Sequence, residues 1–467
     1  SLRLRFDWQE EMLQVIDREG TLSWRYLDLS GQSPAQQDEA FERLLAQDRT
    51  TPYELGAGSL FRVYLLKRGE KTYTCLFNTH HAILDGWSSP LLLDTLHGFY
   101  LALLEGRPCE MPLDSYPASQ RYLQRHTREH EEFWRGYLGD LEGGGDLGGL
   151  LRDGRTPTDI AQCKQIRQQG QRSLFLGPAL LDELKTTARK SGVTLNVLLQ
   201  YAWHKVLSVF GRSTQTVVGT VVAGRELPVD HIDRSIGLHL NTLPLRVRHT
   251  QPASTPLLAE LLQLQDDINE INQRSTIDLA RLQRNGERLF DSLFIYENYP
   301  NSTSAAHDRL LNAVFKARYE KRDYPLVVSV GEQQGGMAWH LDFAEELFEP
   351  AAIERLLASA GWILGQLKGD LERSSATLSF LPEREAERLL RQWNATDSEP
   401  GPALTIHQAF EACAAATPEA VALEHHGRTL SYRLLNGYAN QIARHALSQQ
   451  PLRPEEPVIL LVDRGEL

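Results

Sequence analysis

The pattern of apolar and polar positions alternates between strand-like and helical stretches over most of the chain. Short stretches in which apolar residues alternate or run together predict strands, and longer stretches with apolar residues every three or four positions predict helices. The predicted strands are residues 2–6, 22–28, 60–66, 73–77, 171–176, 216–222, 236–247, 292–296, 324–330 and 337–343. The predicted helices are residues 34–47, 91–104, 118–141, 179–210 with an interruption at 191–192, 257–275 and 351–367. Strands that alternate with helices in this way, twice over, predict two α/β lobes of similar construction.

Stretches rich in glycine or proline divide this pattern. Residues 143–150 contain a glycine-rich run and predict a flexible connection between a first lobe, residues 1–142, and a second lobe, residues 151–380. Residues 381–402 turn charged and then rich in proline and glycine, which predicts an interdomain linker. Residues 403–467 form a third, short unit that includes an apolar strand at 458–462. A unit this small predicts a fragment of a larger domain.

Composition and charge exclude several classes of partner. The chain of 467 residues has 49 Lys and Arg against 61 Asp and Glu, a net charge of −12, and no cluster of basic residues. We therefore expect no nucleic acid and no membrane as a partner. The four cysteines lie far apart, which predicts neither a disulfide framework nor a zinc site and suits a reducing cytoplasm. The chain lacks an apolar run of roughly 20 residues and a signal-peptide core, so we expect a cytoplasmic protein, with a bacterium as its source.

One stretch between a predicted strand and a predicted helix carries the best candidates for chemistry. Two imidazoles, a carboxylate and a glycine fall close together after the strand at 73–77, namely His80, His81, Asp85 and Gly86. Ser89 and Pro90 then predict the N-cap and the first position of a helix. Loops held between rigid elements commonly carry functional side chains. We therefore expect the functional site here.

The two adjacent histidines are expected to have different roles, because neighbouring residues of a strand point to opposite faces. Three interpretations of the pair stay open at this point. Histidine and aspartate are metal ligands, but no further ligand group stands at a matching spacing. Both imidazoles could instead be hydrogen-bonded in a core. Alternatively, one histidine removes a proton during acyl transfer, since its unperturbed pKa lies near neutrality.

The surrounding residues limit the chemistry without fixing it. The chain has neither a Gly-x-Ser-x-Gly elbow nor a reactive cysteine context, which favours direct transfer between two bound substrates over a covalent intermediate. Asp85 either orients His81 or forms a structural ion pair with an arginine. Gly86 is either a turn residue or a glycine that lets a substrate approach the backbone closely.

Residues 80–86, His-His-Ala-Ile-Leu-Asp-Gly, resemble the HHxxxDG signature of condensation domains of nonribosomal peptide synthetases. The shorter HxxxDG pattern also occurs in chloramphenicol acetyltransferase-like and plant-type acyltransferases. Other stretches are similar to further motifs of the family, in the right order: residues 2–6, 28–30, 221–225, 236–238 with 241–244, and 297–300. The resemblance covers nearly all of residues 1–380. The family's first helix and strand, which precede the first of these motifs, are missing from this chain.

The remainder of the chain resembles a different part of such synthetases. Residues 393–396, Trp-Asn-Ala-Thr, are similar to the WNxT linker that joins condensation to adenylation domains. Residues 406–407, 417–422 and 430–432 resemble the opening of an adenylation domain, with Leu434 where that family has a glutamate. The chain ends before any ATP-binding or amino-acid-selecting motif, so we do not expect residues 403–467 to adenylate a substrate.

The resemblance implies a fold and an activity. The fold is α/β, with two chloramphenicol acetyltransferase-like lobes in a V-shaped pseudo-dimer and a small α/β fragment of an adenylation domain. The activity is amide-bond formation, in which the α-amine of an acceptor aminoacyl thioester attacks a donor thioester. Both substrates arrive on 4'-phosphopantetheine arms of donor and acceptor peptidyl carrier domains, and the chain itself binds no cofactor and no metal. The rest of the synthetase, including the remainder of the adenylation domain, is the other expected partner.

The resemblance also implies roles for single residues. His81, the second histidine of the motif, takes the proton from the amine or holds the amine for attack, and His80 is its packing partner. Asp85 is a structural residue, with Arg225 as its expected partner, and Gly86 presents its amide to the substrate or the oxyanion. Three further residues are expected at a tunnel or on the substrate side, namely Trp87, Ser88 and Asn241. The Trp87-Ser88 pair resembles the DGWS pattern of domains that accept a donor ending in an L residue.

Two other functions stay open. A stand-alone HxxxDG acyltransferase that uses coenzyme A would not need the adenylation-like residues 403–467. A catalytically silent, condensation-like scaffold that binds carrier or tailoring partners would not need the complete set of two histidines, an aspartate and a glycine.

Overall fold

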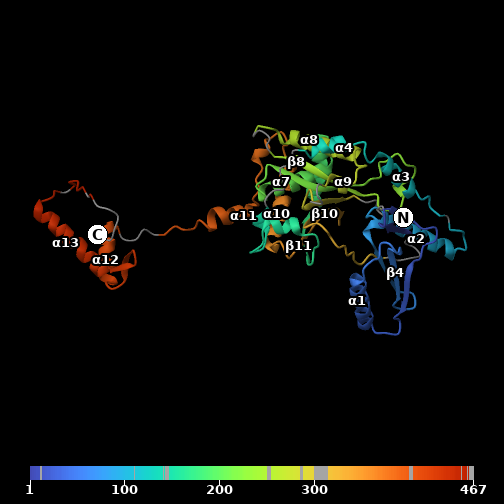
Figure 1. The fold of residues 1–467 in the computed structure, drawn as a ribbon, viewed down its shortest axis with the longest axis horizontal. Coiled ribbons are helices and arrows are strands. Elements are labelled where there is room, and N and C mark those ends of the chain that lie inside the picture. The colour runs from blue at the N-terminus through green and yellow to red at the C-terminus, as the bar shows by residue number, and fades with distance from the viewer. Residues whose placement is uncertain are drawn as a thin grey trace. The chain divides into compact units, whose positions relative to one another are not determined.

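The computed structural model describes residues 1–10, 13–109, 111–139, 141, 147–249, 254–283, 288–298, 314–398, 403–453, 455–459 and 461. These residues fall into two compact units, Ser1–Glu383 and Arg384–Leu467, and each is described by itself. The first unit consists of a first lobe built on strands β1–β5, blue in Figure 1, and a second lobe built on strands β6–β11. In the part of the chain that is described, no helix is long and apolar enough to cross a bilayer.

The first lobe contains a two-stranded and a three-stranded sheet. Its strands are β1 (Leu4–Asp7), β2 (Leu13–Ile16), β3 (Ser23–Asp28), β4 (Phe61–Lys67) and β5 (Tyr73–Thr79). Its helices are α1 (Pro34–Thr50), α2 (Ser88–Leu104) and α3 (Tyr116–His126). Strand β1 pairs with β2, and β4 lies between the parallel strand β3 and the antiparallel strand β5. The strands predicted at 60–66 and 73–77 are therefore confirmed, and they pair as a hairpin.

The core of the first lobe fixes the backbone of the candidate site. Its buried members are Leu4, Phe6, Leu60, Phe61, Val63, Ile83, Leu84 and Tyr116. Ile83 and Leu84 lie between the histidines and the aspartate of the motif. Burying one such side chain stabilises the fold by about 1.5–3 kcal/mol, so the apolar middle of the motif anchors its polar ends.

The second lobe is a mixed six-stranded sheet packed against helices. Its strands are β6 (Gln169–Leu176), β7 (Gln215–Val222), β8 (Asn241–Arg248), β9 (Ser292–Glu297), β10 (Leu326–Gln333) and β11 (Gly336–Ala344). Its helices are α4 (Glu131–Tyr137), α5 (Pro157–Gln162), α6 (Pro178–Ser191), α7 (Leu195–Phe210), α8 (Leu257–Gln273), α9 (Leu279–Leu282) and α10 (Pro350–Leu367). The strand order is β6-β11-β10-β9-β7-β8, with β9 parallel to both of its neighbours and the other pairs antiparallel. The break predicted at 191–192 is confirmed, because Gly192 takes a left-handed conformation with φ 69° after α6.

The helix predicted over residues 118–141 is wrong as one element, because the chain forms two helices, α3 and α4, on either side of residues 127–130. The Thr276 hydroxyl of the second lobe donates to the His126 carbonyl at 3.2 Å, which ties the end of α3 to the second lobe. Trp134 of α4 is fully buried in the second-lobe core, and its indole N–H donates to the Arg274 carbonyl at 3.1 Å. These tertiary contacts decide where the helix ends, and local sequence does not show them.

The predicted connection at 143–150 is described only from residue 147 onward. Leu147 and Leu150 lie in a short 3-10 helix, Leu147–Leu150, and both pack into the second-lobe core. Residues 142–146 lie outside the described residues, as does the end of the predicted motif at 297–300. The core of the second lobe thus begins at Trp134, upstream of the glycine run.

The second unit starts with a short helical stretch and continues as a small α/β arrangement. Its elements are α11 (Glu383–Glu387), whose first residue precedes the unit boundary, the π-helix η6 (Arg388–Gln392), α12 (Ile406–Ala416), β12 (Val421–His425), β13 (Arg428–Ser431) and α13 (Tyr432–Gln449). Thr405 and Gln408 form a capping box at the start of α12, and β12 pairs with β13 as a hairpin. The strand predicted at 458–462 falls partly outside the described residues.

Candidate functional site

The candidate motif begins where strand β5 ends. The His80 backbone N–H donates to the Leu60 carbonyl at 2.9 Å, which keeps His80 aligned with the sheet. The Ala82 N–H then donates to His80 Nδ1 at 3.1 Å, so this imidazole caps the short helix η1 (His81–Ile83). His80 is therefore a structural cap of the turn that presents His81.

The two histidines occupy different surroundings, as their adjacent positions predict. His80 packs edge-on against the Tyr53 ring, with ring centroids 5.7 Å apart, and burial lowers the pKa of His80. The side chain of His81 is 55% exposed. His81 is therefore the more exposed of the two histidines.

The imidazole of His81 meets a carboxylate from the second lobe. Its Nε2 atom lies 3.3 Å from Oε1 of Glu320, and this hydrogen bond raises the pKa of His81 above its ordinary value, against the opposing effect of burial. Sequence reasoning missed Glu320, whose only local signal is its place between Arg318 and Arg322 just before a strand. The contact spans most of the first unit's sequence, so spacing alone does not reveal it.

Asp85 and Arg225 are brought together at the junction of the two lobes. Arg225 Nη2 lies 3.2 and 3.3 Å from the two oxygens of Asp85, and their side chains are only 4% and 0% exposed. The backbone N–H groups of Ser88, His239 and Leu240 also donate to the Asp85 carboxylate, at 2.8, 2.9 and 3.3 Å. A buried carboxylate with these donors is satisfied as an anion and holds the lobes together.

The same contacts rule out a metal role for Asp85 in this arrangement. Both oxygens of its carboxylate already accept hydrogen bonds, Oδ1 from Ser88 and Arg225 and Oδ2 from His239, so neither is left as a free ligand. Across the described part of the chain, no group of three or more His, Cys, Asp or Glu side chains is arranged to hold a metal ion.

Helix α2 begins two residues earlier than Ser89 and Pro90 predict. Its first residue is Ser88, because Asp85 Oδ1 accepts the Ser88 N–H and so satisfies a free amide of the first turn. The N-cap position is Trp87, whose side chain makes no capping bond. Gly86 is buried in the turn that leads directly into this helix.

Ser88 and Asn241 differ from their expected place on the substrate side. The hydroxyl of Ser88 is fully buried, where it donates to the Gly237 carbonyl at 2.8 Å and accepts from Arg225 at 2.9 Å. The Asn241 amide donates to the carbonyls of Ser275 and Ile277 at 2.9 and 2.7 Å. Both side chains are thus hydrogen-bonded to groups of the junction around them.

Trp87 is half-buried over the loop that carries Arg225. Its indole N–H donates to the Asp233 carbonyl at 3.3 Å, and the Arg225 guanidinium lies 5.7 Å from its ring. Trp87 therefore covers the outer side of the Asp85–Arg225 pair.

Two glycines allow the second-lobe loop to approach the motif. Gly224, before Arg225, has φ +63°, and a Cβ atom there would lie 1.9 Å from the His239 carbonyl oxygen. A Cβ atom on Gly237 would lie 2.3 Å from the Tyr116 ring. Larger residues at these positions would push the loop away from Asp85.

His239 is a second residue of the junction that sequence reasoning did not select. Its ring contacts Ser119 Oγ at 3.4 Å and Ser235 Oγ at 3.1 Å, and it packs edge-on against Tyr116. Burial lowers its pKa to about 4, so the ring is neutral near pH 7. A neutral imidazole beside the buried ion pair adds no competing charge.

We expect Ser88→Ala to lower the free energy of unfolding of the first unit by about 1–3 kcal/mol, because it leaves the Gly237 N–H, 3.0 Å from the hydroxyl, without its acceptor. Urea unfolding followed by tryptophan fluorescence measures the change. Ser89→Ala is the matched control, since the Ser89 hydroxyl makes only a 3.3 Å bond to the Asp85 carbonyl. Equal stability of the two variants would contradict the junction role of Ser88.

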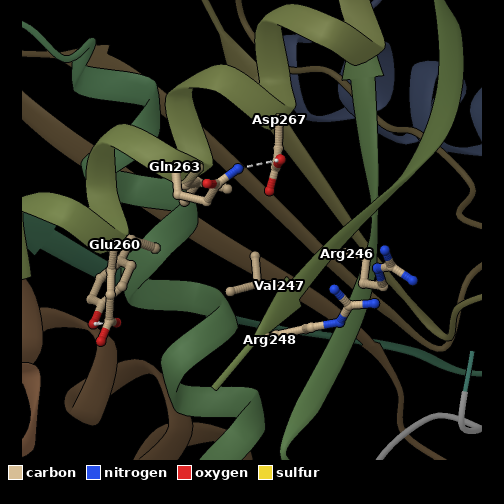
Figure 2. A pocket seen from close by; sticks show the side chains of 8 residues that line it. Arg246, Val247, Arg248, Glu260, Gln263 and Asp267 are labelled. Atoms are coloured by element: carbon tan, nitrogen blue, oxygen red, sulfur yellow. Dashed lines mark hydrogen bonds between the residues drawn. The ribbon is translucent and has the colours of Figure 1, made fainter. Parts of the chain in front are cut away.

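Two of the pockets formed by the described residues are lined mainly by the second lobe. One, of about 280 Å³, lies between β8 and α8, where Figure 2 shows Arg246 and Arg248 opposite Glu260 and Asp267. None of the predicted site residues lines this pocket. The other, of about 350 Å³, is lined by Gly224 and Glu226 on either side of Arg225, and by Thr276. It is thus next to the junction, whereas the pocket in Figure 2 is not.

Comparisons with known proteins agree with this arrangement. A family model described as "Condensation domain" matches residues 1–390. N-(5-amino-5-carboxypentanoyl)-L-cysteinyl-D-valine synthase of Amycolatopsis lactamdurans is 39% identical over an alignment that covers 100% of this chain and 13% of the relative. A linear gramicidin synthase of Brevibacillus parabrevis is 32% identical, with 99% of this chain and 9% of the relative covered. The chain thus spans a small part of the length of these relatives.

A solved structure shows the same fold. The crystal structure of a holo four-domain nonribosomal peptide synthetase bound to AMP and glycine matches 96% of this chain and 35% of its own, with a TM-score of 0.69 and 18% identity. The predicted α/β fold class with chloramphenicol acetyltransferase-like lobes is confirmed by this likeness. The chain therefore belongs to the condensation-domain family of nonribosomal peptide synthetases, whose enzymes form peptide bonds by acyl transfer.

Proposed function

We propose that this chain joins two carrier-bound substrates through an amide bond. The α-amine of an acceptor aminoacyl thioester attacks the carbonyl of a peptidyl or aminoacyl donor thioester, and the donor carrier thiol leaves. The observation that carries this proposal is the exposed imidazole of His81, presented at a lobe junction that Asp85 and Arg225 hold closed. The family match of residues 1–390 supports the same activity.

The residues of the motif have different roles. His81 accepts the proton of the attacking amine or holds that amine in line. Gly86 directs its backbone N–H to the oxyanion of the tetrahedral intermediate, where such a donor acts by electrostatic stabilisation. His80, Asp85 and Arg225 hold these groups in place. Positioning two tethered substrates contributes more to the rate than one general base, which supplies about 10²–10⁴-fold.

The proposed partners are donor and acceptor carrier domains, each with a 4'-phosphopantetheine arm that belongs to the carrier and is not bound as a cofactor by this chain. We propose residues 1–142 and 151–380 as the two lobes of the condensation domain, with α4 of the first packed into the core of the second. Residues 143–150 connect the lobes, and residues 381–402 are the linker. The boundary between the compact units, at residue 383, supports a linker there. The expected cytoplasmic location stays a prediction.

We assign residues 403–467 to the start of an adenylation domain. The likeness to the four-domain synthetase covers 96% of this chain and so extends past the condensation domain. Large apolar side chains of this unit are exposed within the described residues, among them Ile406 and Ile442. This exposure supports a unit that packs against further chain.

We further propose a donor that ends in an L residue, on the resemblance of Trp87-Ser88 to the DGWS pattern. Because Ser88 is buried and Trp87 covers Arg225, this pair acts on the donor through the shape of the junction. With one acceptor carrier, we expect the L-alanyl donor to give at least about tenfold faster product formation than the D-alanyl donor, the scale of one well-placed contact. Equal rates, measured by intact mass, would contradict the L-donor assignment.

The experiment that tests the proposed function compares two forms of donor. The acceptor carrier is loaded with an L-aminoacyl thioester and incubated with this chain and a donor. In one reaction the donor acyl group is attached to a donor carrier, and in the other the same donor acyl group is attached to coenzyme A. Amide product from the carrier-bound donor supports the proposal. Product only from coenzyme A favours a stand-alone acyltransferase, and no product from either donor across glycyl, L-alanyl, L-phenylalanyl and L-lysyl thioesters favours the scaffold.

A further inference from the structure

A second-lobe segment reaches the exposed histidine of the first lobe. We call residues 314–323 the second-lobe arm, which leads into strand β10. Its Glu320 brings Oε1 to 3.3 Å from Nε2 of His81, and the Arg49 guanidinium of α1 lies 3.8 Å from the ring of Tyr319 on the same arm. The arm therefore contacts the first lobe at two places, one of which is the proposed working imidazole.

The carboxylate of Glu320 is held as an anion by its neighbours. Arg318 Nη2 and Arg322 Nη1 each lie 2.8 Å from its oxygens, and its side chain is only 18% exposed. Burial alone would raise the pKa of Glu320, but the hydrogen bond from His81 and the two arginines outweigh burial and lower the pKa to about 2. Glu320 is thus charged throughout the neutral range.

The arm is anchored to the sheet of its own lobe. Arg322 Nε donates to Asp342 of β11 at 3.2 Å, and Arg322 Nη2 donates to Ser329 of β10 at 3.2 Å. The side chain of Gln169 accepts from the Arg322 backbone N–H at 3.1 Å and donates to the Glu320 carbonyl at 3.2 Å. These bonds fix the position of the Glu320 backbone relative to the sheet.

The charged and titratable groups around His81 favour its protonated form. Glu320 does so most strongly through its hydrogen bond, and Arg318 on the same arm opposes it. The ring of His81 also donates to its own backbone carbonyl. His80, beside it in the chain, has a lowered pKa, and Asp323 acts on His80 in the opposite direction. The contact of Nε2 with Glu320 therefore sets the direction of the ring.

We propose that Glu320 is a positioning residue of the condensation site, supplied by the second lobe, which orients the His81 imidazole through the contact of its carboxylate with Nε2. This inference rests on the proposed function, because it adds a residue to that site. Glu320 takes no part in bond making. The site is complete only when the second-lobe arm lies against the first lobe.

The sign of the pH dependence follows from the two shifts. Because the pKa of His81 is raised on folding, the stability that its pairing contributes is full below its ordinary pKa of about 6.5 and is lost as pH rises through the raised value. The contribution of Glu320 is present above its ordinary pKa of 4.5 and is lost as pH falls toward about 2. If neutral His81 is the active form, condensation increases as pH rises through the raised pKa.

The Glu320→Gln variant tests the inference by two measurements, the pKa of His81 and the condensation rate. NMR titration of ¹³C-labelled histidine is expected to show a His81 pKa above its ordinary value in the parent and closer to about 6.5 in the variant. The single-turnover condensation rate is expected to fall about tenfold. It is measured with L-alanyl thioesters on both carriers, or with a glycyl, L-phenylalanyl or L-lysyl pair if that pair reacts instead. The rise of that rate with pH moves to lower pH. Glu320→Asp should recover part of the rate.

A matched control and a double variant separate positioning from folding. Glu332→Gln removes another second-lobe carboxylate, which pairs with Lys185 at 2.7 Å, and should leave the His81 pKa and the rate unchanged. In the His81→Ala background, Glu320→Gln should have no further effect, because a positioning residue acts only through its partner.

The inference is overturned if Glu320→Gln leaves the His81 pKa unchanged, or if it slows the parent and the His81→Ala variant by the same factor. A parent that forms no amide with any donor and acceptor pair would overturn the proposed function instead. The NMR titration would still decide whether Glu320 sets the protonation of His81, so the two failures are distinguishable.

Discussion

Asp85→Ala is expected to lower the free energy of unfolding of the Ser1–Glu383 unit by about 3–5 kcal/mol, the scale for removal of one partner from a buried ion pair. The substitution leaves the Arg225 guanidinium buried without its counter-charge and frees three backbone N–H groups of the junction. Urea unfolding followed by tryptophan fluorescence measures the loss. Condensation should fall with it, because the motif and the second lobe are no longer tied.

The control for this prediction is an ion pair at the surface. Asp38→Ala removes the exposed partner of Arg68 and should cost about 1 kcal/mol or less. Arg225→Met in the Asp85→Ala background should recover part of the stability, since it removes the uncompensated buried charge. If Asp85→Ala were no more destabilising than Asp38→Ala, the buried pair would not hold the junction.

His81→Ala is expected to lower the single-turnover condensation rate by about 10²–10⁴-fold while the domain stays folded, the range typical of a lost general base. The side chain is 55% exposed and lies outside the first-lobe core, so its removal costs little packing. Quenched-flow sampling with intact-mass detection measures the rate, and circular dichroism checks the fold. His445→Ala, at an exposed position of α13, should have the parent's rate.

The pH profile distinguishes the two roles left open for His81. A base gives a rate that increases with pH through the raised pKa of His81 in the parent and loses this dependence in His81→Ala. A group that only positions the amine leaves the profile of the amine itself, whose reference pKa is about 7.7–8.0. Parent and variant with the same rate would remove His81 from the mechanism.

Much of the local structure follows from sequence because it depends on short-range pattern. The hairpin of β4 and β5, the break at Gly192 and the strands on either side of the Gly335-Gly336 turn all rest on turn residues and apolar periodicity. The different surroundings of His80 and His81 were expected from strand geometry, but both residues follow β5, and the turn that His80 caps separates them. In each case the cause and the effect lie within a few residues of each other.

The features that sequence did not predict depend on contacts between distant segments. The end of α3 is set by Thr276, which lies 150 residues further along the chain than His126. Ser88 was expected near the substrate because it follows the motif, yet the second-lobe loop buries it. Glu320 reaches His81 from more than two hundred residues away, and no spacing rule connects them.

The pairing of Asp85 with Arg225 could be predicted only in part from the sequence. The resemblance to the family suggested an arginine partner, and the structure places Arg225 at that position with Gly224 to admit it. Arg225 can take this position because Gly224 has a left-handed φ and no Cβ, so that the loop can approach the His239 carbonyl closely. A sequence without alignment cannot separate such a glycine from an ordinary turn.

The most direct test of this account is the intact mass of the acceptor carrier after incubation with the parent chain and the loaded donor carrier. The account predicts that the acceptor gains the mass of the donor acyl group and that hydroxylamine, which cleaves thioesters, does not separate that group from the acceptor's amino acid. A control without the chain should show no gain. The account is contradicted if the acceptor keeps its starting mass with the glycyl, L-alanyl, L-phenylalanyl and L-lysyl pairs while both carriers remain loaded.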